Sequence, residues 1–509
     1  MHTSTQYVDA LIVNPSALNQ IYQNLSHDLA AIEPPIWAAL IANHLRAKNY
    51  ATDILDCEGL GLTVPAAVAK IADYDARLIV IVVYGQQPSA STQNMYAASA
   101  LCAAVKEAMP EKKIVFVGGH VSALPERTMR EEQADFVCQG EGPATVVGLL
   151  ETADLDSPSQ LEKVPGLWFR KDGMATFSFA AAVIPQAELD RQLPGMAFDL
   201  LPMPNYRAHN WHCFDRINER QPYASVYTSL GCPFRCSFCC INAPFGKSSF
   251  RYWSPNFMIQ QFDALAARYN VRNIKIADEM FVLRESHFLE LCRLLKERKH
   301  GFNIWAYSRV DTVKPQYLAE LKAAGVNWLA LGIESKSKFV RDGVAKGRFQ
   351  DADIFRVVRE IKDSGIHAIG NYIFGLPDDN IETMRETLDM ALETNCEMAN
   401  FYSAMAYPGS QLFDMAVREG VALPESWLGY SQHAFECLPL ATKHISAGEV
   451  LAFRDHAWTE YFTSARYLDL VKEKFGMDTF RHVVEMATRV LPRKYASQIA
   501  LPRTTGKGG

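Results

Sequence analysis

Three closely spaced cysteines are the residues of this 509-residue sequence best suited to chemistry. Cys232, Cys236 and Cys239 are separated by three and then by two residues in the segment GCPFRCSFC, residues 231–239. Thiolates this close on one loop can reach a single soft metal centre, but structural zinc sites and ordinary electron-transfer clusters use four protein ligands. Three ligands in register favour a cubane iron–sulfur cluster with one open iron. The alternative is a zinc knuckle or three buried cysteines.

The elements that must position this loop alternate between strands and helices. A β-rich run at residues 224–228 precedes the cysteines, and Ser254 followed by Pro255 marks a helix start after them. Gly325 and Gly365 each end a helical pattern just before a new strand. Further strands are expected at residues 273–277, 302–307, 328–333, 368–374 and 400–405. This order predicts a βα barrel, in which functional groups gather at the carboxyl ends of the strands.

Candidate binding residues follow four successive strands of the expected barrel. Any one acid or serine among them is usually an ordinary surface residue, but loops on a rigid scaffold carry function. Their shared position at strand ends therefore favours a ligand site. They are Asp278 and Glu279, then Ser308 and Arg309, then Glu334 and Ser335, and finally the segment 370–377 with Ile373 and Gly375.

The first third of the chain shows the same alternation of strands and amphipathic helices. Strands are expected at residues 8–13, 52–55, 78–83, 113–117 and 135–138. The pattern predicts a doubly wound parallel sheet that binds ligands at the carboxyl ends of its strands. The loops after the last three strands supply the candidates Tyr84, Gly85, Gln86, Gln87, Ser89, Ser91, Gly118, Gly119, His120, Gly140 and Glu141. A nucleotide-binding or purely structural Rossmann-like unit is the alternative, although no GxGxxG follows the first strand.

The cysteine loop resembles the CxxxCxxC motif of the radical S-adenosylmethionine (SAM) superfamily, including the aromatic Phe238 before the last cysteine. The resemblance implies a [4Fe-4S] cluster on the three cysteines, with SAM on the open iron, in an open barrel of about six βα units. It also implies roles for the strand-end residues. Asp278 and Glu279 would bind the SAM ammonium group, Ser308 and Arg309 its carboxylate or ribose, Glu334 and Ser335 its ribose, and Ile373 and Gly375 its adenine side.

The three loops of the first third, placed before that motif, look like the cobalamin-binding domain of one large branch of the superfamily. The Asp-x-His-x-x-Gly motif that supplies a lower cobalt ligand in many cobalamin proteins is absent. The resemblance therefore implies cobalamin whose lower face has no histidine ligand, with residues 84–87 beneath the cobalt. His120 is the only histidine in these loops and is the alternative ligand.

Composition and sequence patterns limit the possible partners, the cellular location and the domain organisation. The net charge of −6 does not indicate the basic surface that is typical of nucleic-acid-binding proteins. No apolar run in the sequence is long enough to span a membrane. Eleven cysteines without an export signal predict a cytoplasmic protein with reduced thiols. We expect a cobalamin-binding Rossmann-like domain at 1–165, a linker at 166–220, a radical SAM partial barrel at 221–415, and a helical cap at 416–509. One long helix is expected from residue 446 to about residue 474.

The resemblance implies an enzyme that methylates an unactivated carbon or phosphorus of a small molecule, through a 5′-deoxyadenosyl radical and methylcobalamin. The expected partners are this substrate and an external electron donor of the flavodoxin or ferredoxin type. One alternative is oxidative cyclisation, ring contraction or rearrangement with the same cofactors. An alternative of another class is a non-catalytic corrinoid carrier or sensor.

Overall fold

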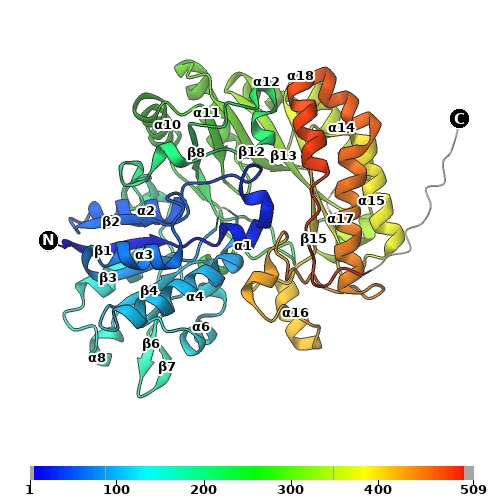
Figure 1. Cartoon of the computed structure of the whole chain (residues 1–509). Helices are drawn as coiled ribbons and strands as arrows, with labels where there is room; N and C mark the ends of the chain where they lie inside the picture. The colour runs from blue at the N-terminus through cyan, green and yellow to red at the C-terminus, as the bar shows by residue number, and fades with distance from the viewer. Residues whose placement is uncertain (1–4, 86, 348, 498–509) are drawn as a thin grey trace, which may run out of the picture.

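Two sheets, the first mostly parallel and the second entirely parallel, organise the chain, which is described by a computed structural model over residues 5–85, 87–347 and 349–497 (Figure 1). The first sheet has the order β2-β1-β3-β4-β5-β6-β7. Its parallel strands are β1 (Gln6–Asn14), β2 (Thr52–Asp56), β3 (Tyr74–Val82), β4 (Ile114–Val117) and β5 (Phe136–Cys138). All five were predicted from the sequence.

Helices cover both faces of this first sheet. Along β1, Ala10 and Ile12 belong to one buried cluster, whereas Leu11 and Val13 belong to another. Both faces of the strand are therefore in a core, as expected for a doubly wound sheet. The helices are α2 (Ile36–Arg46), α3 (Val64–Ile71), α4 (Ala90–Ala108), α5 (Gly119–Ala123), α6 (Pro125–Glu131), α7 (Pro143–Glu151) and α8 (Pro158–Leu161).

The second sheet is an open half-barrel of six parallel strands in the order β15-β14-β13-β12-β11-β8. Its strands are β8 (Tyr223–Val226), β11 (Asn273–Ile276), β12 (Asn303–Arg309), β13 (Val326–Glu334), β14 (His367–Phe374) and β15 (Met398–Ser403). The helices between them are α10 (Pro255–Tyr269), α11 (Glu285–Arg298), α12 (Pro315–Ala323), α13 (Lys338–Gly343), α14 (Asp351–Asp363) and α15 (Ile381–Thr394).

The local signals that predicted these units are present in the structure. Ser254 caps α10 by accepting a hydrogen bond from the Phe257 backbone N–H. Gly325 and Gly365 have φ values of +94° and +80°, the left-handed conformation that ends a helix before a new strand. A separate two-stranded ribbon, β9 (Ser229–Leu230) with β10 (Arg251–Tyr252), brackets the cysteine loop.

The connecting segment begins with a hairpin that turns at Asp172 and Gly173, both of which have positive φ. Its hairpin, β6 (Leu167–Lys171) and β7 (Met174–Phe177), adds two antiparallel strands to the edge of the first sheet through β5. A short helix, α9 (Leu189–Gln192), and several 3₁₀ turns then carry the chain to the barrel. The hairpin is thus part of the first sheet.

The expected single long helix is two helices, which corrects the sequence prediction. After α16 (Gln411–Glu419), the chain forms α17 (Ala447–Thr463) and α18 (Ala465–Ala487), and α18 is itself kinked at Gly476, where φ is +83°. The two helices meet at Ser464, which has an extended backbone and whose hydroxyl accepts a hydrogen bond from the Tyr467 N–H. Helical periodicity continues through this residue, so only its capping chemistry could have marked the break.

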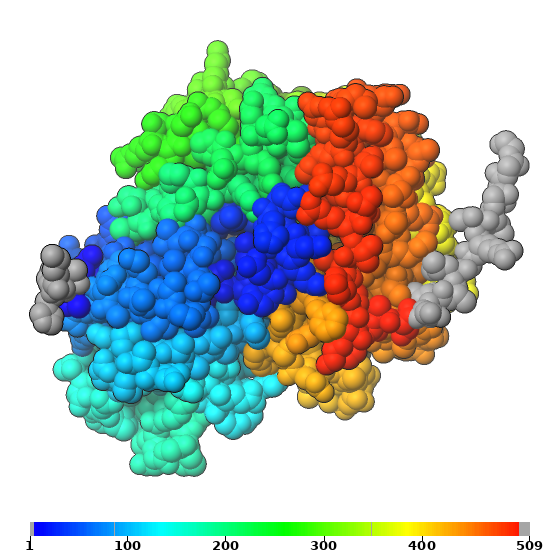
Figure 2. All heavy atoms as spheres, viewed as in Figure 1, coloured from blue at the N-terminus to red at the C-terminus, as the bar shows by residue number. Residues whose placement is uncertain are grey.

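A segment that follows β1 packs against the C-terminal region beside the half-barrel. The dark blue segment around α1 (Leu18–Tyr22) lies against the red C-terminal helices (Figure 2). The Gln23 amide donates to the His433 carbonyl, and Arg489 pairs with Asp28 at 2.6 Å. The contact closes one side of the space between the sheets. None of the helices described here is long and apolar enough to cross a membrane.

Candidate functional site

The three cysteines of the motif line one cavity of about 240 Å³ at the carboxyl end of the half-barrel. All three are half-buried. Their loop is held from two sides, because Ser237 donates its N–H to the Val344 carbonyl at 3.1 Å and accepts from the Leu412 N–H at 2.9 Å. Three thiols on a pinned loop around one cavity fit a cluster held by three protein ligands.

Two buried cations flank these cysteines. The Arg309 Nη1 atom lies 3.7 Å from Cys236 Sγ, and Asp311 holds the guanidinium with two hydrogen bonds of 2.8 and 2.9 Å. Lys346 pairs with Glu334 at 2.6 Å. Burial lowers the pKa of Lys346, but the nearby Glu334 and Cys236 together outweigh burial and raise this pKa above its ordinary value.

Sequence reasoning missed Lys346. It lies on a loop after α13 that carries no motif, and it reaches the cavity only because the barrel folds. Its partner Glu334 ends β13 with φ at +69°. A non-glycine residue in this conformation costs about 1–3 kcal/mol, and such residues cluster at functional sites.

Five of the eight residues expected to contact SAM line the cysteine cavity. They are Glu279, Ser308, Arg309, Glu334 and Ile373. No hydrogen bond from any described residue reaches the Glu279 carboxylate, and burial raises the pKa of Glu279 to about 7. The Ser308 hydroxyl is buried and has no partner within the described chain. An unpaired acceptor and an unpaired hydroxyl beside the cysteines fit a polar ligand such as an amino-acid group.

The other three of these residues do not line the cavity. Both Asp278 carboxylate oxygens accept hydrogen bonds from the backbone and hydroxyl groups of Thr228 and Ser229, at 2.5–3.0 Å. Asp278 therefore fixes the strand end that leads into the cysteine loop. The Ser335 hydroxyl contacts Thr387 Oγ1 at 3.2 Å, inside the barrel wall. Gly375 packs against Val450 of α17, where a Cβ would approach to 2.4 Å.

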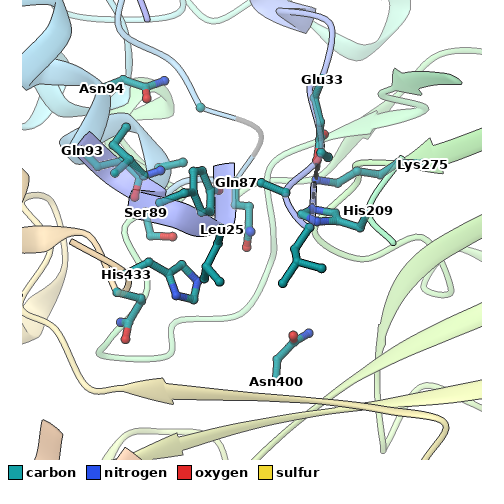
Figure 3. A pocket seen from close by; sticks show the side chains of 18 of the residues that line it. Leu25, Glu33, Gln87, Ser89, Gln93, Asn94, His209, Lys275, Asn400 and His433 are labelled. Atoms are coloured by element: carbon teal, nitrogen blue, oxygen red, sulfur yellow. Dashed lines mark hydrogen bonds and ion pairs between the residues drawn. The ribbon is translucent and has the colours of Figure 1, made fainter. Parts of the chain in front are cut away.

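A second cavity, of about 250 Å³, lies between the first sheet and the half-barrel (Figure 3). Tyr84, Gly85, Gln87 and Ser89 line it from the loop after β3. The Tyr84 ring stacks on Trp37 with ring centroids 4.5 Å apart. Six residues line both this interdomain cavity and the cysteine cavity: Gln87, Ser89, Tyr307, Tyr402, Tyr407 and Gln432. The two cavities therefore share a wall.

The other residues expected to bind cobalamin divide into three groups. Ser91, Gly119 and His120 line a small space beside the interdomain cavity. Gly118, Gly140 and Glu141 line none of these spaces. Gln86 is outside the described residues. A Cβ on Gly118 would lie 2.2 Å from the Val83 carbonyl oxygen, so this glycine allows close contact between two strand ends.

Glu141 forms a buried ion pair between the two halves of the molecule. Its carboxylate accepts two hydrogen bonds from Arg251 of β10, at 2.8 and 3.2 Å, and one from the Ile184 N–H at 2.8 Å. Both side chains are less than 10% exposed. The acid expected in the cobalamin loop thus ties that loop to the strand that follows the cysteines.

His120 is enclosed by protein. Its Nδ1 lies 3.3 Å from Thr92 Oγ1, and its ring packs edge-on against Trp427 with centroids 4.4 Å apart. Burial lowers the pKa of His120 to about 3, so the imidazole is neutral at physiological pH. Its Nε2 has no hydrogen-bond partner among the described residues.

Comparison with known proteins identifies both halves of the chain. The family model described as "Radical SAM superfamily" matches residues 226–391, and the "B12 binding domain" model matches residues 25–150. An uncharacterized methyltransferase, PH0819, of Pyrococcus horikoshii is 27% identical over 91% of this chain and 94% of its own length. The anaerobic magnesium-protoporphyrin IX monomethyl ester cyclase of Rubrivivax gelatinosus is 25% identical over 77% of this chain and 68% of its own length.

Solved structures show the same architecture. The cobalamin-dependent SAM radical enzyme OxsB aligns with a TM-score of 0.68 and 16% identity, covering 96% of this chain and 72% of that one. The radical SAM methyltransferase TsrM from Kitasatospora setae aligns with a TM-score of 0.64 and 14% identity, covering 95% and 100%. The predicted fold is confirmed. With a B12-binding domain followed by a radical SAM half-barrel, this protein is a radical SAM enzyme that belongs to the cobalamin-binding radical SAM family.

Proposed function

We propose that this enzyme methylates an unactivated carbon or phosphorus of a small molecule, with a [4Fe-4S] cluster, SAM and cobalamin as cofactors. The shared wall between the cysteine cavity and the interdomain cavity carries the proposal, because it brings both expected cofactor sites to one space. When bound, the cluster and SAM supply a 5′-deoxyadenosyl radical, and methylcobalamin supplies the methyl group.

In this proposal, the residues of the cysteine cavity hold and orient SAM. Cys232, Cys236 and Cys239 hold the cluster. Glu279 is the acceptor for the SAM ammonium group, since its carboxylate faces the cavity without a partner from the described chain. Arg309 and Lys346 bring N–H donors to the cysteine cavity, where they can bind a carboxylate group, although Asp311 and Glu334 cancel much of their charge.

On the other side of the shared wall, Tyr84, Gly85, Gln87 and Ser89 form the floor for cobalamin. Gln87 and Ser89 line both cavities, which suits residues between two cofactors. We propose that His120 stays in its pocket against Trp427 and does not bind cobalt. The proposed domain limits are 1–165 for the cobalamin-binding domain, 166–220 for the connection, 221–415 for the barrel and 416–509 for the cap, although the hairpin of the connection, β6 and β7, extends the sheet of the first domain. We also propose an external electron donor of the flavodoxin or ferredoxin type.

Cyclisation or another oxidative rearrangement with the same cofactors is the second candidate. It is supported by the relatives named as cyclases, which align over 77% and 84% of this chain. A non-catalytic corrinoid carrier or sensor is less compatible with three cysteines arranged around one cavity.

The test is product analysis with the anaerobically reconstituted enzyme, a reductant and SAM carrying a deuterated methyl group. Methylation predicts 5′-deoxyadenosine together with a product that carries the labelled methyl group. A product that has lost two hydrogens and carries no label would establish cyclisation instead. Cobalamin binding without any 5′-deoxyadenosine would leave only the carrier or sensor.

A further inference from the structure

A buried group of charged side chains forms one wall of the interdomain cavity and has no place in the proposal above. Lys275 Nζ lies 3.2 and 3.1 Å from the two Glu33 oxygens, and His209 Nε2 lies 3.6 Å from Glu33 Oε1 (Figure 3). Ser225 donates its hydroxyl to Glu33 Oε2 at 2.8 Å. Glu33 precedes α2, His209 belongs to the connecting segment, and Lys275 and Ser225 belong to barrel strands, so this cluster forms only in the folded chain.

The two charges at the centre of this cluster cancel. Glu33 and Lys275 are 6% and 1% exposed. Burial raises the pKa of Glu33, but Lys275, His209 and Ser225 together lower it to about 2, so the carboxylate is ionised. The Lys275 ammonium also lies over the Trp305 ring, 5.0 Å from its centroid. A ligand beside this wall meets a compensated ion pair, which attracts neither anions nor cations strongly.

His209 is the member of the cluster that is open to the cavity. Its side chain is 27% exposed, and its ring stacks on Trp211 with centroids 5.5 Å apart. The Glu33 carboxylate faces Nε2, which favours the tautomer with its hydrogen on that nitrogen. Nδ1 then carries a lone pair and has no partner among the described residues. Burial lowers the pKa of His209, which keeps the ring neutral.

The rest of the cavity is rich in aromatic side chains. The aromatic side chains that line it come from α2, the connecting segment, the half-barrel strands β12 and β15, and α17: Trp37, Trp211, Trp305, Phe401, Tyr402 and Trp458. Such walls favour a flat or apolar body, while isolated polar groups fix its orientation. In Figure 3, His209 lies across the pocket from Ser89, Gln93 and His433. It is therefore on the wall opposite the loop that we assign to cobalamin.

We propose that His209 Nδ1 accepts a hydrogen bond from a neutral hydroxyl or N–H group of the substrate, whose apolar body lies against the aromatic walls. This inference deepens the proposed function and rests on it. Glu33 and Lys275 act through His209 as positioning residues. The substrate class is thus an apolar, ring-containing molecule with a neutral hydrogen-bond donor at one end.

The test uses probes that differ only in their polar end. Binding of 2-naphthaleneethanol and of its methyl ether to the cobalamin- and cluster-loaded enzyme is measured by anaerobic isothermal titration, without reductant. A net hydrogen bond predicts that the alcohol binds roughly 2- to 10-fold more tightly than the ether. His209→Phe should remove this difference, and His209→Gln, which keeps an acceptor, should restore part of it. 2-Naphthaleneacetate and 2-naphthaleneethylamine should bind more weakly than the alcohol.

Matched controls separate His209 from the rest of the cavity. His433→Phe changes a second cavity histidine that has no carboxylate partner in the described chain, and the alcohol–ether difference should persist. Aquacobalamin affinity should be unchanged in His209→Phe. The proposal is overturned if the alcohol does not bind, if His209→Phe keeps the difference, if an ionic probe binds best, or if cobalamin affinity falls. Because no turnover is measured, these results are independent of whether methyl transfer is the reaction.

Discussion

Arg309 places its guanidinium 3.7 Å from the sulfur of Cys236, and Asp311 fixes it there through two hydrogen bonds. The Phe234 ring, 4.0 Å from the guanidinium carbon, covers its other side. If Cys236 holds the cluster as proposed, a fixed positive charge beside it stabilises the reduced, more negative state of the cluster. We therefore propose an electrostatic role for this strand-end arginine as well as a role in SAM binding.

Arg309→Gln should lower the midpoint potential of the cluster. A unit charge at this range is worth about 1–4 kcal/mol, and Asp311 cancels part of it, so we expect a shift of roughly tens of millivolts. A redox titration followed by electron paramagnetic resonance measures the shift. Arg418→Gln changes an exposed arginine on α16 and should leave the potential unchanged. An unchanged potential in Arg309→Gln would contradict the electrostatic role.

Cys236→Ala should abolish the brown cluster absorbance and SAM cleavage while cobalamin binding survives. The cysteine belongs to the cavity wall of the half-barrel, whereas the loop assigned to cobalamin belongs to the first sheet. Cys240→Ala is the matched control, because this neighbouring buried cysteine is outside the motif and should be dispensable for the cluster. SAM cleavage by Cys236→Ala would falsify the assignment of the three ligands.

The Co(II) form of the bound cobalamin should show no nitrogen superhyperfine splitting in electron paramagnetic resonance. His120 is held between Thr92 and Trp427, and leaving this pocket would break both contacts. His120→Ala should give the same spectrum as the wild-type protein. Splitting that disappears in His120→Ala would instead identify this histidine as the lower ligand.

Glu58→Gln should stabilise the protein at alkaline pH. Burial, with help from Asp56 and Glu33, raises the pKa of Glu58 from 4.5 to about 8. Between these values the native state holds a proton that the unfolded state has released, so the free energy of unfolding falls as pH rises from about 4.5 to 8. At pH 8.5 we expect Glu58→Gln to raise the free energy of unfolding by roughly 1–4 kcal/mol relative to the wild-type protein. At pH 5 the increase should be much smaller.

Urea denaturation at the two pH values measures this difference. Glu473→Gln replaces an exposed glutamate of α18 and should behave like the wild-type protein at both. Equal gains for Glu58→Gln at pH 5 and pH 8.5 would rule out titration of Glu58 as the cause.

Glu141→Gln should destabilise the protein by about 3 kcal/mol, because it leaves the buried Arg251 charge without its counterion. The exposed pair Arg127–Glu131 provides the control, since Glu131→Gln should cost less than about 1 kcal/mol. Cobalamin affinity should change little while the folded state persists. A large loss of cobalamin affinity without a loss of stability would instead indicate that Glu141 contacts cobalamin.

Much of the fold was predictable because its signals are local. Many strands of the two sheets appear in the sequence as largely apolar runs, and capping by Ser254 and the turns at Gly325 and Gly365 mark helix limits. The break at Ser464 was missed because the apolar pattern continues through it. A helix end can be predicted from the sequence when it interrupts the apolar periodicity, as at Gly325 and Gly365. It is easily missed when the periodicity continues across it, as at Ser464.

The sequence predicted at which strand ends the candidate site lies, but not which of the side chains there face the cavity. Neighbouring residues there point in different directions, so Glu279 faces the cavity while Asp278 bonds to Thr228 and Ser229. Lys275 did leave a signal, because a lysine in the buried strand NIKI requires a partner. Its partner Glu33, 242 positions earlier in the chain, could not be identified from that signal.

The sequence by itself determined the spacing of the three motif cysteines, the order of the two domains and the sheet edges at which the candidate binding residues lie. These features can be recognised from residue spacing and apolar periodicity, which are patterns within short segments of the chain. Only the tertiary structure decided which strand-end side chains face a cavity, that Lys346 joins Arg309 beside Cys236, and that Glu33, His209 and Lys275 form one cluster. Such contacts depend on side-chain direction and on packing between distant segments, which local sequence patterns do not encode.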